Sequence, residues 1–293
     1  MKDAPVRHAI EFGCFQLLRG FVRILPHSAS RSLGSVLGSV AYRLMSGRRR
    51  IALGNLALAL PELTDVEHQR IAKAAFRQMM SHATEFLSWN RFDAVQLCER
   101  WTLEGWEHLT EATREHGPLF LMTGHLGPWE LLPHAVAQYL PSVSALVRRL
   151  DNPRLDAVVS AQRTRFGLEL IHKHGAARRL MRRVQGGGHV IVLVDQRVKP
   201  RDSVEVPFFG RPARTANLIA RLALKNGTPV VPIFVYPEPN GRYRIVARPA
   251  IPADASGDDP VRELTGRYLE AVEAEVRQHP EVWLWMHDRW RST

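Results

Sequence analysis

His125 and Glu130 stand five residues apart in the stretch TGHLGPWELL, which follows directly after the apolar run PLFLM. An imidazole has a pKa near 6.5, so it can take a proton from an alcohol around neutral pH. A carboxylate on its second ring nitrogen fixes the tautomer and stabilises the imidazolium that forms. The pair therefore predicts a general base, His125, with Glu130 as its orienting partner. The alternative is a loop histidine followed by a glutamate in the first turn of a helix.

Further polar residues follow other apolar runs that are typical of strands. Asp195, Gln196 and Arg197 come after HVIVLV, and Arg148 and Arg149 come after VSALV. Since the carboxyl ends of parallel strands meet at one edge of a sheet, we expect these residues to join the histidine in a catalytic and anion-binding rim. Taken alone, Asp195 also fits a strand-end cap, and each arginine also fits a solvated surface charge.

The chain lacks the sequence features of several other kinds of catalysis. It has no Gly-x-Ser-x-Gly elbow, and Cys14 and Cys98 lie in no reactive context. The glycines of QGGGHV lead into a strand rather than a helix, so they do not form a nucleotide-binding loop. Neither His125 with Glu130 nor the HKH at residues 172–174 has a convincing third metal ligand. We therefore expect general-base chemistry with no metal and no cofactor.

The elements that would position these residues alternate between short strands and helices. Strands are expected at residues 118–123, 143–147, 168–171, 189–194, 230–236 and 243–247, and helices at 129–140, 154–166, 176–185, 216–225 and 261–278. This order is typical of an α/β fold whose largely parallel central sheet is flanked by helices. Residues 48–104 favour a helical lead-in, with Thr64 as a helix cap before Val66. We therefore predict one domain over residues 48–293, with its α/β core at residues 105–293.

An amphipathic segment precedes this domain. Residues 8–25, HAIEFGCFQLLRGFVRIL, place their polar residues along one stripe of a helix and are too interrupted to span a membrane. The pattern predicts a helix in a membrane interface, with Phe12, Phe15, Leu18, Phe21 and Val22 toward the acyl chains. The alternative is an amphipathic helix packed on the domain. A second run at residues 33–45 would lie beside the first as a hairpin, so residues 1–47 form the predicted membrane-associating segment.

The charge of the chain indicates an acidic partner. Its 40 basic residues, mostly arginine, give a formal net charge of +11 at pH 7. Anionic lipid headgroups, a phosphorylated substrate or an acidic protein fit that charge. No nucleic-acid-binding signature is present, so no nucleic-acid partner is expected. The two cysteines form no disulfide framework, which fits a reducing compartment.

Motifs spread from residue 48 to the C-terminus carry a family resemblance. Besides GHLGPWE they are RRRIALGNLALALPEL, RRLDNPRLD, RTRFGLELI, DQR, VPFFGRPARTA, GTPVVPIFVY and PEVWLWMHDRW. Together they resemble the bacterial lipid A biosynthesis lauroyl/myristoyl (late) acyltransferases, within the His-x4-Asp/Glu glycerolipid acyltransferase superfamily. The resemblance implies a glycerolipid-acyltransferase-like fold. It also implies transfer of an acyl group from a thioester, usually on acyl carrier protein, to a hydroxyl of a lipid A precursor, a membrane glycolipid. It places the protein on the cell inner membrane, peripheral or monotopic, at the cytoplasmic face.

The resemblance also assigns roles to individual residues. It implies His125 as the base, Glu130 as its partner, and Asp195 with one arginine of RTRFG, Arg163 or Arg165, as supporting groups. The residues expected to bind substrate are Arg148, Arg149, Asn152, Gln196 and Arg197. Three alternatives remain open: an acyltransferase for another lipid, a thioesterase-type hydrolase with the same His/Glu pair, and a non-catalytic basic lipid-binding module.

Overall fold

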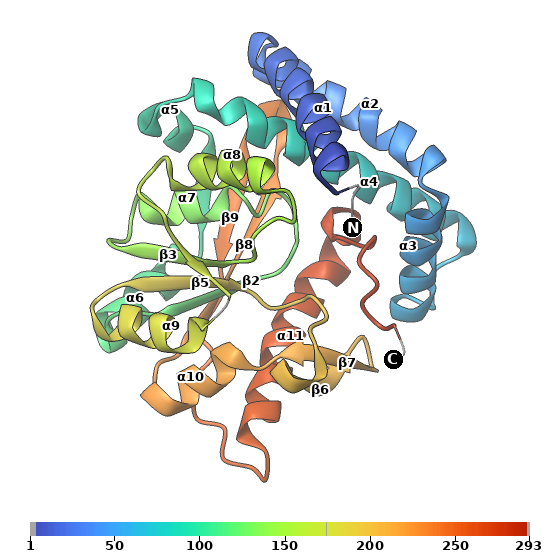
Figure 1. The fold of residues 1–293 in the computed structure, drawn as a ribbon. Coiled ribbons are helices and arrows are strands. Elements are labelled where there is room, and N and C mark those ends of the chain that lie inside the picture. Colours follow the sequence, from blue (N-terminus) through green and yellow to red (C-terminus); the bar gives the residue numbers. More distant parts are fainter. Residues whose placement is uncertain (1–3, 174, 292–293) are drawn as a thin grey trace.

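The apolar runs of the chain form a seven-stranded sheet in a computed structural model that describes residues 4–173 and 175–291 (Figure 1). Five adjacent strands, in the order β8, β2, β5, β3 and β4, are parallel to one another. β9 is antiparallel to β8, and β1 pairs with β9 at the edge. In the order of the sheet, β1-β9-β8-β2-β5-β3-β4, the strands are Trp101–Glu104, Tyr243–Ala247, Val230–Pro237, Phe120–Thr123, His189–Leu193, Val143–Val147 and Glu169–His172. The predicted α/β class with a largely parallel sheet is confirmed.

Successive side chains on the central strands are buried on opposite faces of the sheet. In β2, Phe120 and Met122 belong to one core, whereas Leu121 belongs to the other. Among the helices that follow β1 in the chain, those that contribute to the first core are α9 (Ala176–Gln185), α10 (Leu218–Asn226) and α11 (Pro260–Gln278). Those that contribute to the second are α6 (Trp106–His116), α7 (Leu132–Ala137) and α8 (Pro153–Thr164). Burial on both faces explains why these strands are continuous apolar runs in the sequence.

Four elements differ from the sequence expectation. The strand β1 lies at the end of the expected helical lead-in, and the antiparallel hairpin of β6 (Ser203–Phe208) with β7 (Arg211–Ala216) lies where no strand was expected. The hairpin is a two-stranded sheet of its own with a proline in each strand, which weakens a strand pattern. The helix expected at residues 129–140 is shorter, because residues 128–131 form a turn closed by the Leu131 amide on the Pro128 carbonyl at 2.8 Å.

Four helices precede the sheet: α1 (Ala4–Ile24), α2 (His27–Leu44), α3 (Ser46–Ala59) and α4 (Asp65–Ser88), and a short α5 (Ala94–Cys98) follows them. Thr64 caps α4 as expected, in a reciprocal capping box with Glu67. α2 lies along α4 rather than beside α1, which corrects the expected hairpin. A Cβ atom at Gly34 or Gly38 would stand 2.4 Å from an atom of α4, so only glycine allows this close packing.

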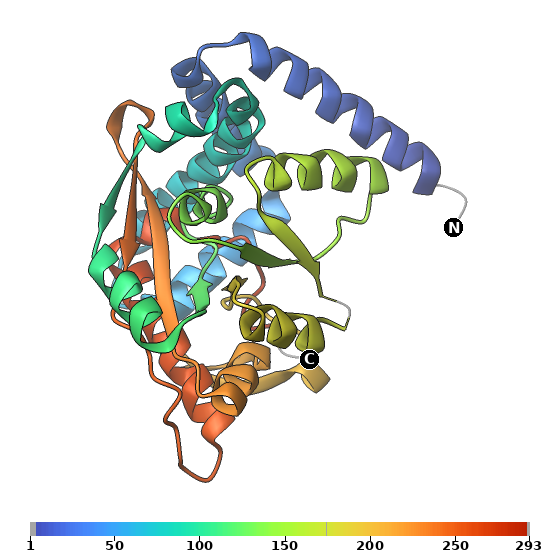
Figure 2. The ribbon, with the colours of Figure 1, turned by 90° about the vertical axis from the view of Figure 1, so that its left-hand side faces the viewer.

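The first helix packs on the domain by one face and exposes the other (Figure 2). Val22 is fully buried, and Phe15 and Leu18 pack against the second core. The expectation that these three residues face a membrane is therefore wrong. Phe21 is exposed as expected, and the other large apolar residues exposed on α1 are Val6, Ile10, Leu17 and Ile24. No helix within residues 4–173 and 175–291 is long and apolar enough to cross a membrane.

Candidate active site

His125 and Asp195 meet because the strands before them are neighbours. β2 and β5 run parallel, and the Val194 amide donates to the Thr123 carbonyl at 3.0 Å beyond the last strand pair. His125 and Asp195, which come just after β2 and β5, therefore lie side by side at the carboxyl edge of the sheet. His125 Nδ1 stands 2.7 Å from Asp195 Oδ1, and the His125 amide donates to Asp195 Oδ2 at 2.7 Å. The expected convergence of strand ends places both residues in one site.

The Asp195 carboxylate selects one tautomer of His125. Nδ1 faces a carboxylate, so Nδ1 carries the proton and Nε2 presents a lone pair. That lone pair accepts a hydrogen bond from the Gln196 side-chain amide at 3.0 Å. The imidazole also packs edge-on against Trp129, with 5.1 Å between ring centroids. The ring is thus held with its basic nitrogen ready for a donor such as a hydroxyl.

Asp195 is buried but stays ionised. Burial alone raises the pKa of this carboxyl, but the charge of His125 and bonds from its ring, from its amide and from Trp283 outweigh burial and lower the pKa to about 2. The Trp283 indole N–H donates to Asp195 Oδ2 at 2.8 Å. Asp195 therefore carries its negative charge at neutral pH and can stabilise an imidazolium beside it.

Glu130 does not contact His125, which corrects the predicted His/Glu pair. Arg163 Nε donates to Glu130 Oε2 at 2.8 Å, and Arg163 Nη2 donates to Glu130 Oε1 at 2.5 Å. Both ring nitrogens of His125 bind other partners, Asp195 and Gln196. Glu130 also precedes α7, which begins at Leu132, so it does not occupy the first helical turn as expected. The spacing of residues along the chain does not reveal that β5 lies beside β2, and β5 leads to Asp195, the carboxylate that contacts His125.

The same ion pair separates the two arginines of RTRFG. Arg163 lies at the end of α8, and the bonds and charge of Glu130 raise its pKa although burial lowers it. Arg165 is exposed, donates to the Trp89 carbonyl at 3.0 Å and lies over the Phe166 ring. Of the two arginines, Arg163 is therefore the one that pairs with Glu130.

The other expected substrate-binding residues fall into two groups. Gln196 bonds His125, and Arg197 is half-buried beside it, with its amide donating to His287 Nε2 at 3.1 Å. Arg148 and Arg149, in contrast, are exposed beyond β3, and Arg148 pairs with Asp151 at 3.2 Å.

Asn152 also lies outside the His125 site but, unlike the two arginines, it is held by structural contacts. Its side chain is buried, accepts from the Arg154 amide as the cap of α8 and donates to the His8 carbonyl of α1 at 2.8 Å. The structure thus brings Gln196 and Arg197 to His125, whereas Asn152 ties α8 to α1.

A C-terminal segment at residues 280–290 holds the His125 loop from outside the sheet. Leu284 donates its amide to the His125 carbonyl at 3.1 Å, and Val282 accepts from the Gly127 amide at 3.0 Å. Gly127 has φ +54°, and a Cβ atom there would lie 2.1 Å from the Val235 carbonyl oxygen, so glycine is required. This segment supplies Trp283 and His287, whose roles the sequence reasoning missed although it quoted their motif.

One further helix and the β6–β7 hairpin support that segment. Asn55 of α3 is buried and donates to the carbonyl oxygens of Trp285 and His287 at 2.8 and 2.7 Å. The fully buried Arg289 donates to the Arg214 carbonyl and the Thr215 hydroxyl, both at 2.6 Å. The helical lead-in and the β6–β7 hairpin therefore position the His125 loop indirectly.

We expect low pH to destabilise the fold through two buried histidines near the site. Burial lowers the pKa of His134 to about 4 and that of His82 to about 3. In the unfolded chain these pKa values lie near 6.5, so below that pH the unfolded state binds protons that the folded state does not. Each histidine should lower the free energy of unfolding by about 2 kcal/mol between pH 7.5 and pH 5. Burial raises the pKa of Glu85 to about 7, which acts in the opposite direction.

The substitution His134→Phe isolates one of these contributions. The ring packs edge-on between Trp89 and Phe166, with centroid distances of 6.0 and 5.3 Å, so phenylalanine can occupy its space. In denaturant titrations at pH 7.5 and pH 5, the variant should lose about 2 kcal/mol less stability than the wild type. The same loss in both proteins would contradict the assignment.

Metal-ligating side chains do not cluster in the part of the chain that the structure describes. Within the described ranges, no three side chains among His, Cys, Asp and Glu form a group that could hold a metal ion. His174, the last residue of the HKH run, lies outside those ranges.

Comparison with known proteins adds a family to this geometry. Residues 3–292 match the family described as bacterial lipid A biosynthesis acyltransferase. The lipid A biosynthesis lauroyltransferase of Escherichia coli (strain K12) is 26% identical over 273 residues, which cover 92% of this chain and 87% of that protein. The lipid A biosynthesis myristoyltransferase of the same organism is 28% identical over 254 residues, 85% of this chain and 77% of that protein. The lipid A biosynthesis acyltransferase 1 of Shigella flexneri is 29% identical with the same coverage.

Proposed function

Since this chain belongs to the family of bacterial lipid A biosynthesis acyltransferases, we propose that it moves a fatty acyl chain from an acyl thioester to a hydroxyl of a membrane glycolipid. The acceptor is a lipid A precursor and the donor an acyl chain on acyl carrier protein. The observation that carries the proposal is the His125–Asp195 pair at the carboxyl ends of two adjacent parallel strands, with Nε2 of His125 accepting a hydrogen bond. An imidazole held in this way is a general base for an alcohol.

The reaction needs one proton transfer in each direction. The acceptor hydroxyl takes the place of the Gln196 amide at His125 Nε2 and gives its proton to that nitrogen as its oxygen attacks the thioester carbonyl. The tetrahedral intermediate then collapses and breaks the carbon–sulfur bond. The thiolate takes the proton from the imidazolium, and it is a good leaving group because thiols have a pKa near 8.5. Asp195 stabilises the imidazolium throughout.

The other polar groups have supporting roles in this proposal. The Glu130–Arg163 ion pair joins the turn after the His125 loop to α8 and positions that turn. Gln196 and Arg197 bind substrate oxygens, and Arg197 has a buried Nε without a hydrogen-bond partner among the described residues. Arg148 and Arg149 lie exposed at the rim, where they attract a phosphorylated acceptor or an acidic carrier protein.

An assay with three outcomes tests the function. Purified protein is incubated with acyl carrier protein loaded with a fatty acid, with and without the lipid A precursor, and both free fatty acid and acylated lipid are measured. Acylated lipid formed only with the acceptor supports transfer. Release of fatty acid at the same rate without the acceptor would identify a thioesterase-type hydrolase, because water would then be the nucleophile. Absence of both products would refute either enzyme activity on these substrates.

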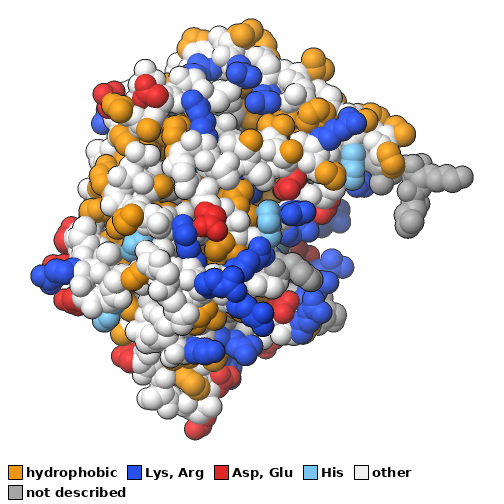
Figure 3. All heavy atoms as spheres, turned by 60° about the vertical axis from the view of Figure 1, so that its left-hand side comes forward, with side chains coloured by type: hydrophobic (Ala, Val, Ile, Leu, Met, Phe, Trp, Pro, Cys, Tyr) orange, Lys and Arg blue, Asp and Glu red, His pale blue; other side chains and the backbone are white. Residues whose placement is uncertain are grey.

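We further propose that residues 1–47 associate with the cytoplasmic face of the cell inner membrane. The exposed apolar side chains of α1 recur at helical spacing, at Ile10, Leu17, Phe21 and Ile24. Figure 3 shows apolar side chains on the projecting end of this helix and basic side chains gathered across the middle of the same face. A helix of this kind lies in the interface with its apolar face in the acyl chains and its cations near phosphates.

Changing Ile10, Leu17, Phe21 and Ile24 together to serine should weaken membrane binding at least about 100-fold, because four apolar side chains no longer leave water. The fraction bound is measured by sedimentation with vesicles. Val66→Ser with Val95→Ser is the matched control, since both valines are exposed, at 75% and 68%, outside residues 1–47. Unchanged sedimentation of the α1 variant would refute the interfacial helix.

A further inference from the structure

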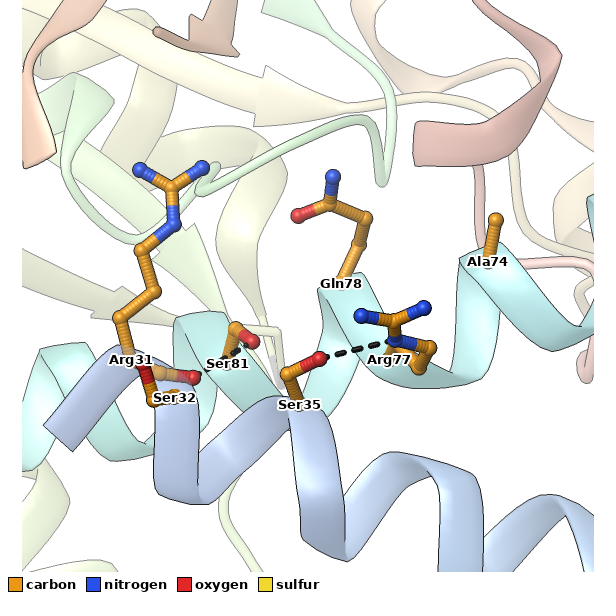
Figure 4. A pocket seen from close by; sticks show the side chains of 7 residues that line it. All are labelled: Arg31, Ser32, Ser35, Ala74, Arg77, Gln78 and Ser81. Carbon is orange, nitrogen blue, oxygen red and sulfur yellow. Dashed lines mark hydrogen bonds between the residues drawn. The ribbon is translucent and has the colours of Figure 1, made fainter. Parts of the chain in front are cut away.

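A polar cavity lies between α2 and α4 and shares no residue with the His125 site. Its volume is about 420 Å³. It is lined by Arg31, Ser32 and Ser35 of α2 and by Ala74, Arg77, Gln78 and Ser81 of α4. Figure 4 shows the side chains of Arg31, Gln78 and Arg77 pointing to the same side of the two helices. The lining therefore holds two guanidinium groups, an amide and three hydroxyls, and no carboxylate.

Both arginines are held in place by other groups. Arg31 Nη1 donates to the Glu238 carbonyl at 2.9 Å, and Arg77 Nε donates to the Ser35 hydroxyl at 2.8 Å. These bonds fix the guanidiniums without neutralising either charge. Glu85 is buried behind the cavity, with Oε1 3.7 Å from Arg31 Nε. Because burial raises the pKa of Glu85 to about 7, this carboxyl offsets only part of the Arg31 charge at neutral pH.

An exposed apolar stripe continues from the wall of the cavity. Ser32, which lines the cavity, is followed at four-residue spacing along α2 by Val36, Val40 and Leu44. Residues at this spacing lie on one face of a helix. The three apolar side chains are 61%, 42% and 77% exposed, respectively. A polar, positively charged cavity thus stands beside an apolar surface on the same helix.

We propose that this cavity binds the phosphomonoester at the head of an anionic membrane lipid. Guanidinium groups bind phosphate oxygens by short, charge-assisted hydrogen bonds, and the hydroxyls and the Gln78 amide suit the remaining oxygens. The stripe of Val36, Val40 and Leu44 lies against the lipid chains. The proposal goes beyond acyl transfer, since it concerns a separate site and holds whether or not the bound lipid is the acceptor. Inorganic phosphate shares the recognised chemistry, so it is a separate arm of the test.

The test measures sedimentation with vesicles of phosphatidylcholine alone or with added phosphatidic acid, which exposes a phosphomonoester. The full-length protein should bind the second kind more tightly. Arg31→Gln with Arg77→Gln should weaken binding to phosphatidic acid vesicles at least about tenfold, because two charge-assisted bonds are lost. Binding to pure phosphatidylcholine should not change. Arg77→Gln alone should weaken this binding about threefold. The effect is smaller because the Arg77 side chain is exposed to solvent and its hydrogen bond in the protein is to the uncharged Ser35 hydroxyl.

Arg43→Gln is the matched control, because Arg43 is an exposed arginine on α2 outside the cavity. It should keep the wild-type preference for phosphatidic acid. If Arg43→Gln weakened binding to phosphatidic acid vesicles as much as the cavity substitutions do, the effect would be general charge attraction and the proposal would be overturned. Wild-type binding by a folded Arg31→Gln/Arg77→Gln variant would overturn it as well. Inorganic phosphate at constant ionic strength should compete with the wild type's binding to phosphatidic acid vesicles. If inorganic phosphate competed equally well with vesicle binding by the Arg31→Gln/Arg77→Gln variant, the cavity would not be the phosphate site.

Discussion

Replacing His125 by alanine is expected to lower kcat for acyl transfer by about 100- to 10,000-fold, the usual contribution of a positioned general base. The KM for the acyl donor should change little, because His125 is not assigned to holding the acyl chain. Without the imidazole, no group takes the proton from the acceptor hydroxyl as the carbon–oxygen bond forms. Initial rates of lipid acylation, measured over a range of both substrates, separate these effects.

The matched control for this substitution is His116→Ala. His116 lies at the end of α6 with its side chain 46% exposed, so its loss should leave both constants near the wild-type values. Near-normal transfer by the His125→Ala enzyme would mean that another residue is the base. The stretch from Thr123 to Leu132 would then be a structural turn.

Asp195→Asn is expected to be nearly as damaging, with a loss in kcat on the order of 100- to 10,000-fold. Oδ2 accepts from the His125 amide and from Trp283, so an asparagine must place its oxygen there. Its NH₂ group then faces His125 Nδ1 and makes that nitrogen an acceptor. The proton moves to Nε2, and the imidazole presents no lone pair to the hydroxyl. Steady-state kinetics with melting temperatures distinguish this loss from unfolding.

Two substitutions with smaller expected effects test the same arrangement of side chains. Trp283→Phe removes one of the bonds to Asp195 and leaves the carboxylate in place, so it should cost activity about tenfold or less. Glu130→Gln breaks the two-bond pairing with Arg163 and leaves the His125 tautomer unchanged, so it should cost less than Asp195→Asn. A larger loss from Glu130→Gln than from Asp195→Asn would contradict the assignment of partners.

The position of the candidate base followed from sequence, whereas its partner did not. A histidine directly after a buried apolar run lies at a strand end, and the structure places His125 there. Asp195 was recognised as a second strand end for the same reason. That the two strands are neighbours depends on the order of the sheet, which the alternation of strands and helices does not determine. The sequence alone therefore favours Glu130, which is nearer along the chain, over Asp195, which is nearer in space.

Elements with strong local patterns were predicted most closely. α9 and β9 have the bounds that the sequence indicates, because each has a clear period and a glycine or charged residue at its ends. β1 is a four-residue edge strand with alternating polar residues, and its pairing with β9 comes from a distant part of the chain. The support of the His125 loop by Trp283 and Leu284 likewise joins residues more than 150 positions apart, which no local pattern reveals.

A double-mutant cycle in kcat tests most directly the claim that Asp195 acts through His125. The enzymes compared are the wild type, His125→Ala, Asp195→Asn and the variant with both changes. Residues that act as one unit have losses that do not multiply. We expect the double variant to be as slow as His125→Ala alone, within about threefold. If the two losses instead multiply, Asp195 acts independently of the imidazole, and the catalytic pair derived from the structure is wrong.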